Sequence, residues 1–543
     1  MDYVLLVTYE FKSHPKIKYF LWLFLFQYRT LCEQSQVLAL GSSQYINNCN
    51  IFYNLNFQAT KKEKKMPFPK NKTKLVCTIG PASEAPEIIL QLIHAGMNVA
   101  RLNYSHGDFS WHRTITKKLN EAARQAGRRL AIMADLPGPK MRIGMLDEEP
   151  IELGRHDEII LTTDDIIGNR HRVSVSFSRL PKVVKIDDTM YLNDGIIRLQ
   201  VLSVDGNDVR CLVRSGGELR SHKGLNLPGI NLGMSAFTEH DYDCLKNALE
   251  SGVDAVSQSF VETAEDIETL RRAASDLGYK PFIIAKIERA GALENYQSIL
   301  QAADGIMVAR GDLGVEIQIE RIAIVQKDLM RAANRMGKPV ITATQMLESM
   351  VEHSRPTRAE STDVSNAILD GTDCLMLSEE SAMGRYPVEA AEMLARIAIA
   401  TEPHRATAGS NAAIDTVEEN PDRADVISCN VQHTVQHLTP LAVIAHTTTG
   451  YTARMISRFK LPLWIAAVSH RESTCQGLQF SYGVFPVHEP QFPDDWEEYA
   501  RSWAKGKGLK EGLLVLTEGP SPDNPDANHR LEIIDLGHVK AVK

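Results

Sequence analysis

Residues 305–344 have the sequence GIMVARGDLGVEIQIERIAIVQKDLMRAANRMGKPVITAT. The stretch begins with an apolar run at 305–312 and ends with another at 339–344. Between them, residues 320–337 repeat apolar side chains with a helical period and finish at Gly337, a residue type that commonly ends helices. A strand, a helix and a second strand in this order predict a unit of two parallel strands joined by a helical crossover.

The same alternation of apolar runs and helical patterns extends through much of the chain from residue 74 onward. Near-continuous apolar runs are typical of strands that are covered on both faces, as in parallel sheets. Eight such strands alternating with helices predict a closed (β/α)8 TIM barrel in the α/β class. The runs are LVCTIG (75–80), NVARLN (98–103), LAIMADL (130–136), DAVSQSF (254–260), FIIAKIE (282–288), GIMVARGD (305–312), PVITAT (339–344) and CLMLSEE (374–380).

The alternation breaks once, between the third and fourth runs. Residues 138–233 carry alternating patterns and hairpin signals instead, for example VLSVDGNDVRCLV around Asp205-Gly206. These features predict an inserted all-β domain. Because the insertion follows the carboxyl end of a barrel strand, it is expected to overhang the catalytic face as a lid.

A second α/β pattern follows a polar stretch that begins near residue 403. Its candidate strands are LAVIAHT (441–447), PLWIAAVS (462–469), GVFPVH (483–488), LLVLTE (513–518) and RLEIIDL (530–536), which predict a carboxyl-terminal α/β domain. The predicted domains are a disordered amino-terminal extension (1–66), the barrel (67–137 and 234–402), the lid (138–233) and a carboxyl-terminal α/β regulatory domain (403–543).

Residues 1–65 differ in composition from the rest. Their aromatic run at 19–26 is too short to span a bilayer. A secretory signal is the alternative, since Lys16 and Lys18 precede the run, but no small-residue cleavage site follows closely. We interpret the stretch as an extension outside the fold, with Met66 as a plausible start, and expect a chain beginning there to be active.

The overall composition narrows the functional classes. The 543 residues are 43% hydrophobic and 24% charged, with a net charge of −8 and no basic cluster, which argues against nucleic acid or a membrane as the main partner. The eight cysteines are spread singly, without a CxxC pair, so neither a zinc site nor a disulfide framework is indicated. A reducing cytoplasm fits this usage best.

Charged residues gather where the predicted barrel strands end, which is where TIM-barrel enzymes place catalytic groups. Side chains two apart on a strand share a face, so Lys286 and Glu288 should project together, as should Arg101 and Asn103. Glu288 and Asp312 are expected at the tips of neighbouring strands, roughly 5 Å apart. Two such carboxylates suit one Mg²⁺, and the alternative for each charge is a solvated rim ion pair.

Two further features point to an anionic substrate. A lysine inside a barrel is costly unless it is paired or functional, which favours a functional Lys286. The glycines of Gly311-Asp312-Leu313-Gly314 expose backbone N–H groups at a possible helix start, which suits a carboxylate or phosphate.

Seven segments of the chain form a recognisable set: TKLVCTIGPAS (73–83), NVARLNYSHG (98–107), GLNLPG (224–229), AKIERAGAL (285–293), IMVARGDLGVE (306–316), PVITATQMLESM (339–350) and PTRAESTDVSNAILDGTDCLMLSEESAMGRYP (356–387). Taken together, they closely resemble pyruvate kinase, and the resemblance runs from about residue 70 to the end. MVARGDLGVE followed by ITATQMLESM is highly specific for that family, which transfers the phosphoryl group of phosphoenolpyruvate to ADP in the final step of glycolysis.

The resemblance implies roles for individual residues. Lys286 and Arg101 would hold the transferring phosphoryl group, Glu288 and Asp312 the first Mg²⁺, and a second Mg²⁺ would arrive with ADP. The substrate carboxylate would meet the backbone at Ala309, Arg310 and Gly311, and Thr344 would lie near the carbon that is protonated. Nucleotide contacts would come from His106, Arg142 and Lys223, and the family's monovalent-cation site from Asn103, Ser105 and Asp135.

Two departures from the family pattern stand out. After Asp135, this chain has Leu136, Pro137 and Lys140 where many relatives have Thr, Lys and Glu. The Lys140 ammonium could replace K⁺ permanently, which predicts a K⁺-independent enzyme of the bacterial type; the alternative is a solvated lysine at the hinge. Glu379 replaces a small residue, which weakens any role for the last strand end.

Three alternatives remain open from sequence. A metal-dependent aldolase or lyase would explain the two carboxylates but not the lid or the paired arginines. A non-catalytic relative would require a lost ligand, and none is missing. The turn at 446–450 (HTTTG) suits a phosphorylated allosteric effector, although an ordinary polar loop explains it equally well. The resemblance also implies a homotetramer.

Overall fold

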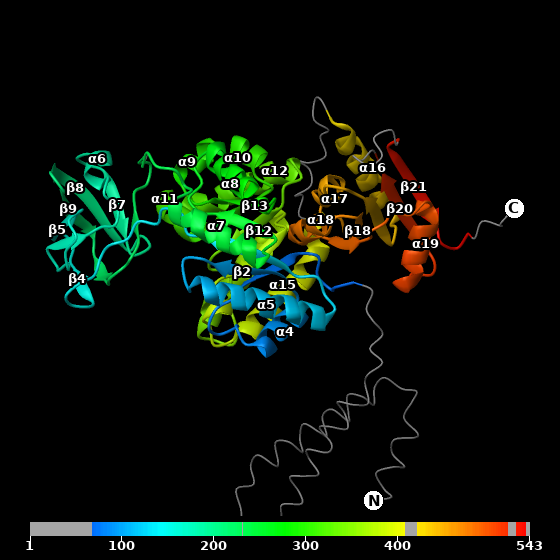
Figure 1. The fold of residues 1–543 in the computed structure, drawn as a ribbon, viewed down its shortest axis with the longest axis horizontal. Coiled ribbons are helices and arrows are strands. Elements are labelled where there is room, and N and C mark those ends of the chain that lie inside the picture. The colour runs from blue at the N-terminus through cyan, green and yellow to red at the C-terminus, as the bar shows by residue number, and fades with distance from the viewer. Residues whose placement is uncertain (1–67, 231, 408–420, 520–527, 539–543) are drawn as a thin grey trace, which may run out of the picture. The chain divides into compact units, whose positions relative to one another are not determined.

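A computed structural model of the chain describes residues 68–230, 232–407, 421–519 and 528–538 (Figure 1). Residues 67–543 form one compact unit. The predictions made for residues 1–66, including the aromatic run and the Met66 start, lie outside the described residues.

Eight parallel strands close into a barrel within the described part of the chain, which confirms the TIM-barrel fold class. Around the barrel the order is β1-β16-β15-β14-β13-β12-β3-β2, so that the last strand pairs with the first. The apolar runs identify these strands because nearly every strand residue is buried, and buried positions favour apolar side chains. The strands are β1 (Lys74–Thr78), β2 (Met97–Asn103), β3 (Ala131–Leu136), β12 (Ala255–Gln258), β13 (Phe282–Ile287), β14 (Gly305–Ala309), β15 (Val340–Ala343) and β16 (Cys374–Leu377).

Several of these strands end earlier than the apolar runs suggest. β12 stops at Gln258, and Phe260 then has φ +57°. β15 stops at Ala343, and Thr344 then has φ +71°. A positive φ is incompatible with an extended strand, so the chain turns at these points. The polar residues of interest therefore stand in the turns just beyond the carboxyl ends of the strands.

Helices alternate with the barrel strands and pack around them (Figure 1). The predicted helix at 320–337 is α12, with Gly337 just past its end at φ +63°. The helices of this region are α4 (Pro86–Ala95), α5 (Phe109–Ala126), α7 (Glu239–Ser251), α8 (Ala264–Asp276), α9 (Ala290–Glu294), α10 (Tyr296–Ala302), α11 (Arg310–Glu316), α12 (Ile322–Arg335), α13 (Arg358–Asp370), α14 (Glu379–Ala382) and α15 (Pro387–Thr401).

The segment between β3 and β12 forms β-sheets with a separate core, as the hairpin signals predict. One sheet has the order β11-β7-β8-β9-β5-β6, and β10 pairs with β4. The predicted hairpin is β8–β9, where Asp205 pairs with Asp208 and Gly206 turns the chain at φ +58°. The elements are β4 (Ile151–Leu153), β5 (Glu158–Thr162), β6 (Arg172–Ser174), α6 (Leu180–Val183), β7 (Thr189–Leu192), β8 (Ile197–Asp205), β9 (Asp208–Ser215), β10 (Gly217–Leu219) and β11 (Leu225–Asn226).

The carboxyl-terminal residues form a sheet of order β19-β18-β17-β20-β21, in which only β21 runs antiparallel. All five predicted strands are present. None of the helices in the described residues combines the length and apolar character needed to cross a membrane. The elements are α16 (Arg423–Leu438), β17 (Ala442–His446), α17 (Tyr451–Ser457), β18 (Trp464–Ser469), α18 (Glu472–Gly477), β19 (Val484–His488), α19 (Trp496–Gly506), β20 (Leu513–Glu518) and β21 (Arg530–Asp535).

The carboxyl-terminal residues also supply part of the barrel interior. Phe480 is fully buried in the same core cluster as Phe282, the first residue of β13, and the two rings stack at 5.3 Å. Asp373, which precedes β16, accepts the backbone N–H of Tyr482 at 2.8 Å and pairs with Lys460 at 2.6 Å. The amino-terminal end of the barrel is therefore filled from outside the barrel sequence.

Candidate active site

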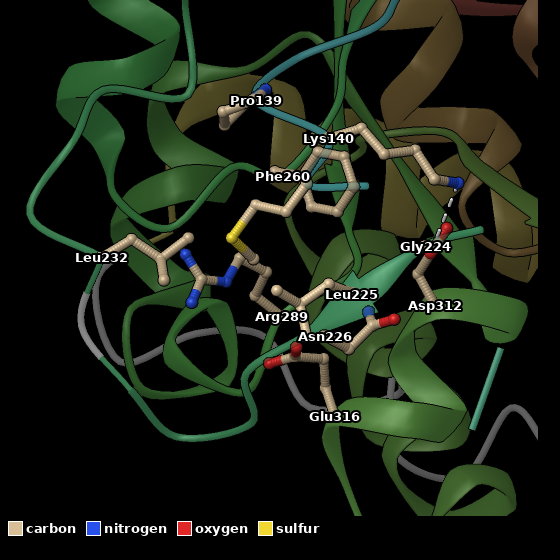
Figure 2. Close-up of a pocket in the computed structure, with 11 residues that line it drawn as sticks. Pro139, Lys140, Gly224, Leu225, Asn226, Leu232, Phe260, Arg289, Asp312 and Glu316 are labelled. Carbon is tan, nitrogen blue, oxygen red and sulfur yellow. Dashed lines mark ion pairs between the residues drawn. The ribbon is translucent and has the colours of Figure 1, made fainter. Parts of the chain in front are cut away.

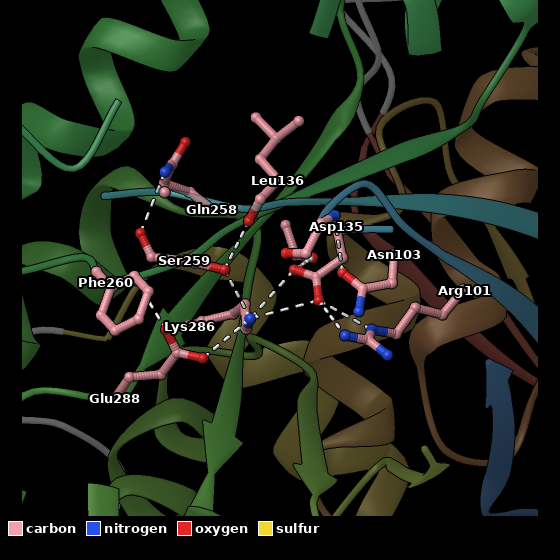
Figure 3. Close-up of polar contacts among 12 residues, drawn as sticks. Arg101, Asn103, Asp135, Leu136, Gln258, Ser259, Phe260, Lys286 and Glu288 are labelled. Carbon is pink, nitrogen blue, oxygen red and sulfur yellow. Dashed lines mark hydrogen bonds and ion pairs between the residues drawn. The ribbon is translucent and has the colours of Figure 1, made fainter. Parts of the chain in front are cut away.

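Asp135 lies at the centre of a charged cluster at the carboxyl end of the barrel (Figure 3). It is almost fully buried near the end of β3. Arg101 of β2 donates to its Oδ2 through Nε at 2.9 Å and Nη2 at 2.5 Å. Ser257 donates to its Oδ1 at 2.7 Å. Burial alone would raise the pKa of Asp135, but the charges of Lys286 and Arg101 hold that pKa below its ordinary value.

Lys286 of β13 joins this cluster to Glu288. Its ammonium lies 2.7 Å from Ser259 Oγ, 2.9 Å from Glu288 Oε1 and 3.3 Å from Asp135. Lys286 and Glu288 therefore lie together, as their spacing indicates. Burial would lower the pKa of Lys286, but the charges of Asp135 and Glu288 raise it, so the buried ammonium stays protonated.

Asp312 does not lie at a strand tip, so that prediction is wrong. β14 ends at Ala309 and the chain turns directly into α11, which carries Asp312 in its first turn. Its charge still reaches Glu288: burial raises the pKa of Glu288, Lys286 opposes the rise and Asp312 adds to it. Glu288 also accepts the backbone N–H of Phe260 at 2.8 Å.

The donor set at Glu288 and Asp312 fits a hard divalent cation. Two neighbouring carboxylates offer oxygen ligands, and Mg²⁺ is commonly held by one or two carboxylates with water and substrate oxygens completing its shell. Among the described residues, no group of three or more His, Cys, Asp or Glu side chains is arranged to hold a metal. Glu288 and Asp312 are the candidate metal site because of the chemistry of their oxygen ligands.

A small cavity of about 20 Å³ lies between the hinge of the inserted segment and the barrel (Figure 2). At its edge the Lys140 ammonium lies 4.0 Å from Asp312 Oδ1, and both side chains are about one-third exposed. Lys140 thus points to the candidate metal ligand rather than to Asp135. Other residues around the cavity are Met141, Asn226, Leu232, Phe260, Arg289 and Glu316.

The residues predicted for a monovalent cation gather only in part. Asn103 of β2 is the register partner of Asp135, and its side-chain oxygen accepts the backbone N–H of Ser105 at 3.2 Å. Lys140 is turned away toward Asp312, as described above. The structure therefore groups the three family residues and places the proposed substitute cation beside another carboxylate.

The residues predicted for the nucleotide come from the barrel and from the inserted segment. Arg142 and Lys223 stand on neighbouring segments of the insertion: Arg142 bridges to Gly224 and donates to the His222 carbonyl at 2.9 Å. His106 follows β2. Burial lowers the pKa of His106, and the positive charges of Arg142, Arg101 and Lys140 lower it further, so these cations lie near it.

Thr344 and the start of α11 approach each other closely. A Cβ added to Gly311 would lie only 2.8 Å from Thr344 Cγ2, so only glycine allows this approach. Ala309, Arg310 and Gly311 thus line the same corner as the Thr344 side chain. Arg310 contacts the Thr344 backbone, which sequence reasoning did not predict.

Sequence reasoning also missed the hydroxyl groups that orient the charged cluster. Ser257 and Ser259 hold Asp135 and Lys286, and Thr78 accepts Arg101 Nη1 at 2.9 Å. A weak signal was present, because Ser257 and Ser259 alternate in the otherwise apolar run DAVSQSF. Serine is too common near strand ends for that signal to stand alone.

A TIM barrel with buried, paired charges and two carboxylates at its catalytic end is typical of enzymes that act on an anionic substrate with a divalent metal. Comparison with known families identifies it further. The family described as "Pyruvate kinase, barrel domain" matches residues 70–391, and "Pyruvate kinase, alpha/beta domain" matches residues 425–529. The chain therefore belongs to the pyruvate kinase family.

Individual relatives agree with this assignment. The chain is 46% identical to pyruvate kinase of Thermococcus litoralis, over 84% of this chain and 96% of the relative. It is 40% identical to pyruvate kinase of Bacillus licheniformis, over 87% of this chain and 81% of the relative. A crystal structure of pyruvate kinase from Cryptosporidium parvum superimposes with a TM-score of 0.80 at 34% identity, covering 86% of this chain and 96% of that one. The chain is thus a phosphotransferase that converts phosphoenolpyruvate and ADP to pyruvate and ATP.

Proposed function

We propose that phosphoryl transfer in this chain takes place at the cluster of Arg101, Lys286 and the two carboxylates Glu288 and Asp312. The observation that carries this proposal is the buried ammonium of Lys286, which is kept charged beside Glu288. Phosphoryl transfer needs positioning and charge neutralisation more than covalent chemistry. Lys286 and Arg101 present fixed positive charge to the moving group, and Asp135 orients both of them.

Glu288 and Asp312 would hold the first Mg²⁺, and a second would come with ADP. When bound, Mg²⁺ neutralises charge on the phosphate oxygens and orients them. The carboxylates of this chain supply the oxygen ligands, and the backbone N–H of Phe260 fixes the Glu288 side chain.

The corner formed by α11 and Thr344 would bind the pyruvate part of the substrate. Backbone groups at Ala309, Arg310 and Gly311 would receive its carboxylate. The Thr344 hydroxyl would stand near the methylene carbon that gains a proton when enolpyruvate becomes pyruvate. The close approach of Gly311 to the Thr344 side chain supports this arrangement, because it places both groups side by side.

His106, Arg142 and Lys223 would contact the ADP phosphates. His106 comes from the barrel and the other two from the inserted segment, so ADP would lie between the two parts. The pKa of His106, lowered by burial and then by nearby cations, favours a neutral ring that donates one hydrogen bond.

Lys140 would replace the monovalent cation of the family at Asn103, Ser105 and Asp135. Its pair with Asp312 joins partly exposed groups at 4.0 Å, and such pairs contribute little free energy. This weak pair would have to break for the Lys140 side chain to turn toward Asp135. Leu136, which is fully buried, removes a polar group from the surroundings of the ion.

Regulation and assembly are proposed from the carboxyl-terminal residues and the family. The turn after β17 would bind a phosphorylated effector, and its Thr447 and Thr449 hydroxyls already accept backbone N–H groups there. The chain would form a homotetramer in the cytoplasm. The six cysteines among the described residues are free, which agrees with a reducing compartment.

One assay tests the catalytic proposal. Pyruvate formation from phosphoenolpyruvate, ADP and Mg²⁺ is compared between the wild type, Lys286→Met and Lys338→Met. Lys338, just before β15, is a matched control, because it is a half-buried lysine that donates to the Ala303 carbonyl. We expect Lys286→Met to lose about 10³-fold in turnover and the control to lose less than about threefold. Equal losses in both variants would refute the role of Lys286.

A further inference from the structure

We infer that the side chain of Arg310 is a positioning residue for Thr344 and thereby controls protonation of the enolpyruvate carbon. The inference rests on the proposed role of Thr344. It concerns the Arg310 guanidinium, which lies outside the backbone contacts proposed for the substrate carboxylate.

The backbone at Thr344 adopts a conformation that its side chain disfavours. Thr344 has φ +71° and the next residue, Gln345, has φ +55°. Positive φ is uncommon for residues other than glycine and is a clear outlier for a β-branched residue such as threonine. Such a conformation persists only where the surrounding structure enforces it, and it is concentrated at functional sites.

The guanidinium of Arg310 provides the enforcing contacts. Its Nε donates to the Ala343 carbonyl at 3.2 Å, and its Nη2 donates to the Thr344 carbonyl at 2.7 Å. Nη2 also lies 2.9 Å from the sulfur of Met346. One planar group therefore contacts the backbone of Thr344, the backbone of the residue before it, and the side chain of Met346, two residues after it.

Arg310 is itself held by an ion pair. Its Nη1 donates to Asp363 Oδ2 at 2.6 Å, and only 11% of the Arg310 side chain is exposed. Asp363 belongs to α13, which follows the Thr344 turn in the sequence. A guanidinium has a rigid fork of donors, whereas a lysine ammonium cannot meet the two carbonyls and the carboxylate in the same plane.

Arg310 also links the Thr344 turn to the candidate metal ligand. It is the first residue of α11, which carries Gly311 at the contact with Thr344 and then Asp312. The contacts of Arg310 therefore set the distance between two parts of the site. One part is proposed to bind phosphate and metal, and the other is the Thr344 hydroxyl beside the methylene carbon. Phosphoryl transfer depends mainly on the first part, and protonation on the second.

The step affected is simple to write. After phosphoryl transfer, the carbon–carbon π pair of enolpyruvate takes a proton that the Thr344 hydroxyl relays from solvent, and forms the new C–H bond. An electron pair on the negatively charged C2 oxygen forms the second bond of the pyruvate carbonyl, and the Thr344 hydroxyl regains a proton from water. Displacing the hydroxyl slows this step and leaves the earlier transfer to ADP largely intact.

The test separates the two steps in the full-length enzyme. ATP formation is measured by rapid quench in a single turnover, and exchange of the pyruvate methyl hydrogens with D₂O is followed by proton NMR. For Arg310→Lys we expect exchange to fall at least about tenfold while ATP formation stays within about threefold, with a larger solvent isotope effect on kcat. Asp363→Asn should change each of the two readouts in the same direction as Arg310→Lys does, but by a smaller factor.

The outcomes are distinct. Equal slowing of both steps in Arg310→Lys and Asp363→Asn, or no change in exchange, would overturn the inference. Thr344→Val serves as the reference for the underlying proposal: if exchange is normal in that variant, the role of Thr344 fails. A wild type that forms no pyruvate would refute the proposed function itself.

Discussion

Arg101 binds a single carboxylate oxygen of Asp135 through two of its nitrogens, Nε at 2.9 Å and Nη2 at 2.5 Å. Its third nitrogen, Nη1, donates to the Thr78 hydroxyl at 2.9 Å. Every branch of the guanidinium is thus fixed by the protein itself. This pre-organisation makes the shape of the group, as well as its charge, important for holding a phosphoryl group.

Arg101→Lys keeps the charge and removes the fork. We expect kcat/KM for phosphoenolpyruvate to fall by about 10², because an ammonium cannot contact Asp135 and Thr78 in the same geometry. Steady-state kinetics measure the change, and the thermal unfolding midpoint serves as the control for folding. Wild-type kinetics in this variant would show that only the charge of Arg101 matters.

Glu288→Gln and Asp312→Asn should each weaken divalent metal binding to the free enzyme by at least about tenfold, because each removes one charged oxygen ligand. Titration with Mn²⁺, followed by electron paramagnetic resonance, measures binding without turnover. Glu316→Gln is the matched control: burial also raises the pKa of Glu316, and it lies on α11 with Asp312. Unchanged Mn²⁺ affinity in the first two variants would exclude this pair as the metal site.

The dependence on monovalent cations tests Lys140. Activity in a tetraalkylammonium buffer should change by less than about twofold when KCl is added, since the tethered ammonium supplies the charge. Lys140→Glu should lower activity and make the remainder respond to K⁺. The KCl titration of both proteins decides the point, and a wild type that K⁺ activates strongly would rule the proposal out.

Asp254 directly precedes β12 and lies outside the proposed active site. Its environment leads us to expect that the free energy of unfolding depends on pH. Burial raises the pKa of Asp254 to about 6, although its carboxylate accepts the backbone N–H of Ile132 at 2.8 Å. The native state therefore binds this proton more tightly than the unfolded chain, so the contribution of Asp254 to the unfolding free energy falls as pH rises from about 4 to about 6.

Asp254→Asn keeps an oxygen acceptor and cannot ionise. We expect it to stabilise the protein by about 1–3 kcal/mol at pH 7.5 and by nearly nothing at pH 4. Denaturant unfolding at the two pH values measures the difference, and Asp276→Asn, at an exposed position, is the control. A variant that is less stable at pH 7.5 would contradict this reading of Asp254.

The barrel could be predicted because its signal is local and repeated. Each run of apolar residues becomes a buried strand, and the two-residue spacing of Lys286 and Glu288 places both side chains in one cluster. The predicted position of Asp312 at a strand tip was wrong, because an apolar run does not show where a strand ends and a helix begins. The charged residues themselves mark that boundary, since they leave the buried sheet.

The contacts that orient the site were less predictable. Arg310 and Asp363 are 53 positions apart, and no local pattern connects them. The positive φ of Thr344 contradicts the preference of threonine for extended backbone, so propensity favoured a longer strand. Both features depend on long-range packing, which the order of residue types does not encode directly.

Phe480 has a consequence for how the chain is made. Its carbonyl accepts the thiol of Cys374 at 3.1 Å, although 106 residues separate the two. All eight barrel strands therefore leave the ribosome well before Phe480, whose ring packs at the amino-terminal end of the barrel. The nascent barrel must wait with Phe282 uncovered until residue 480 has emerged, so its final closure is an event late in, or after, translation.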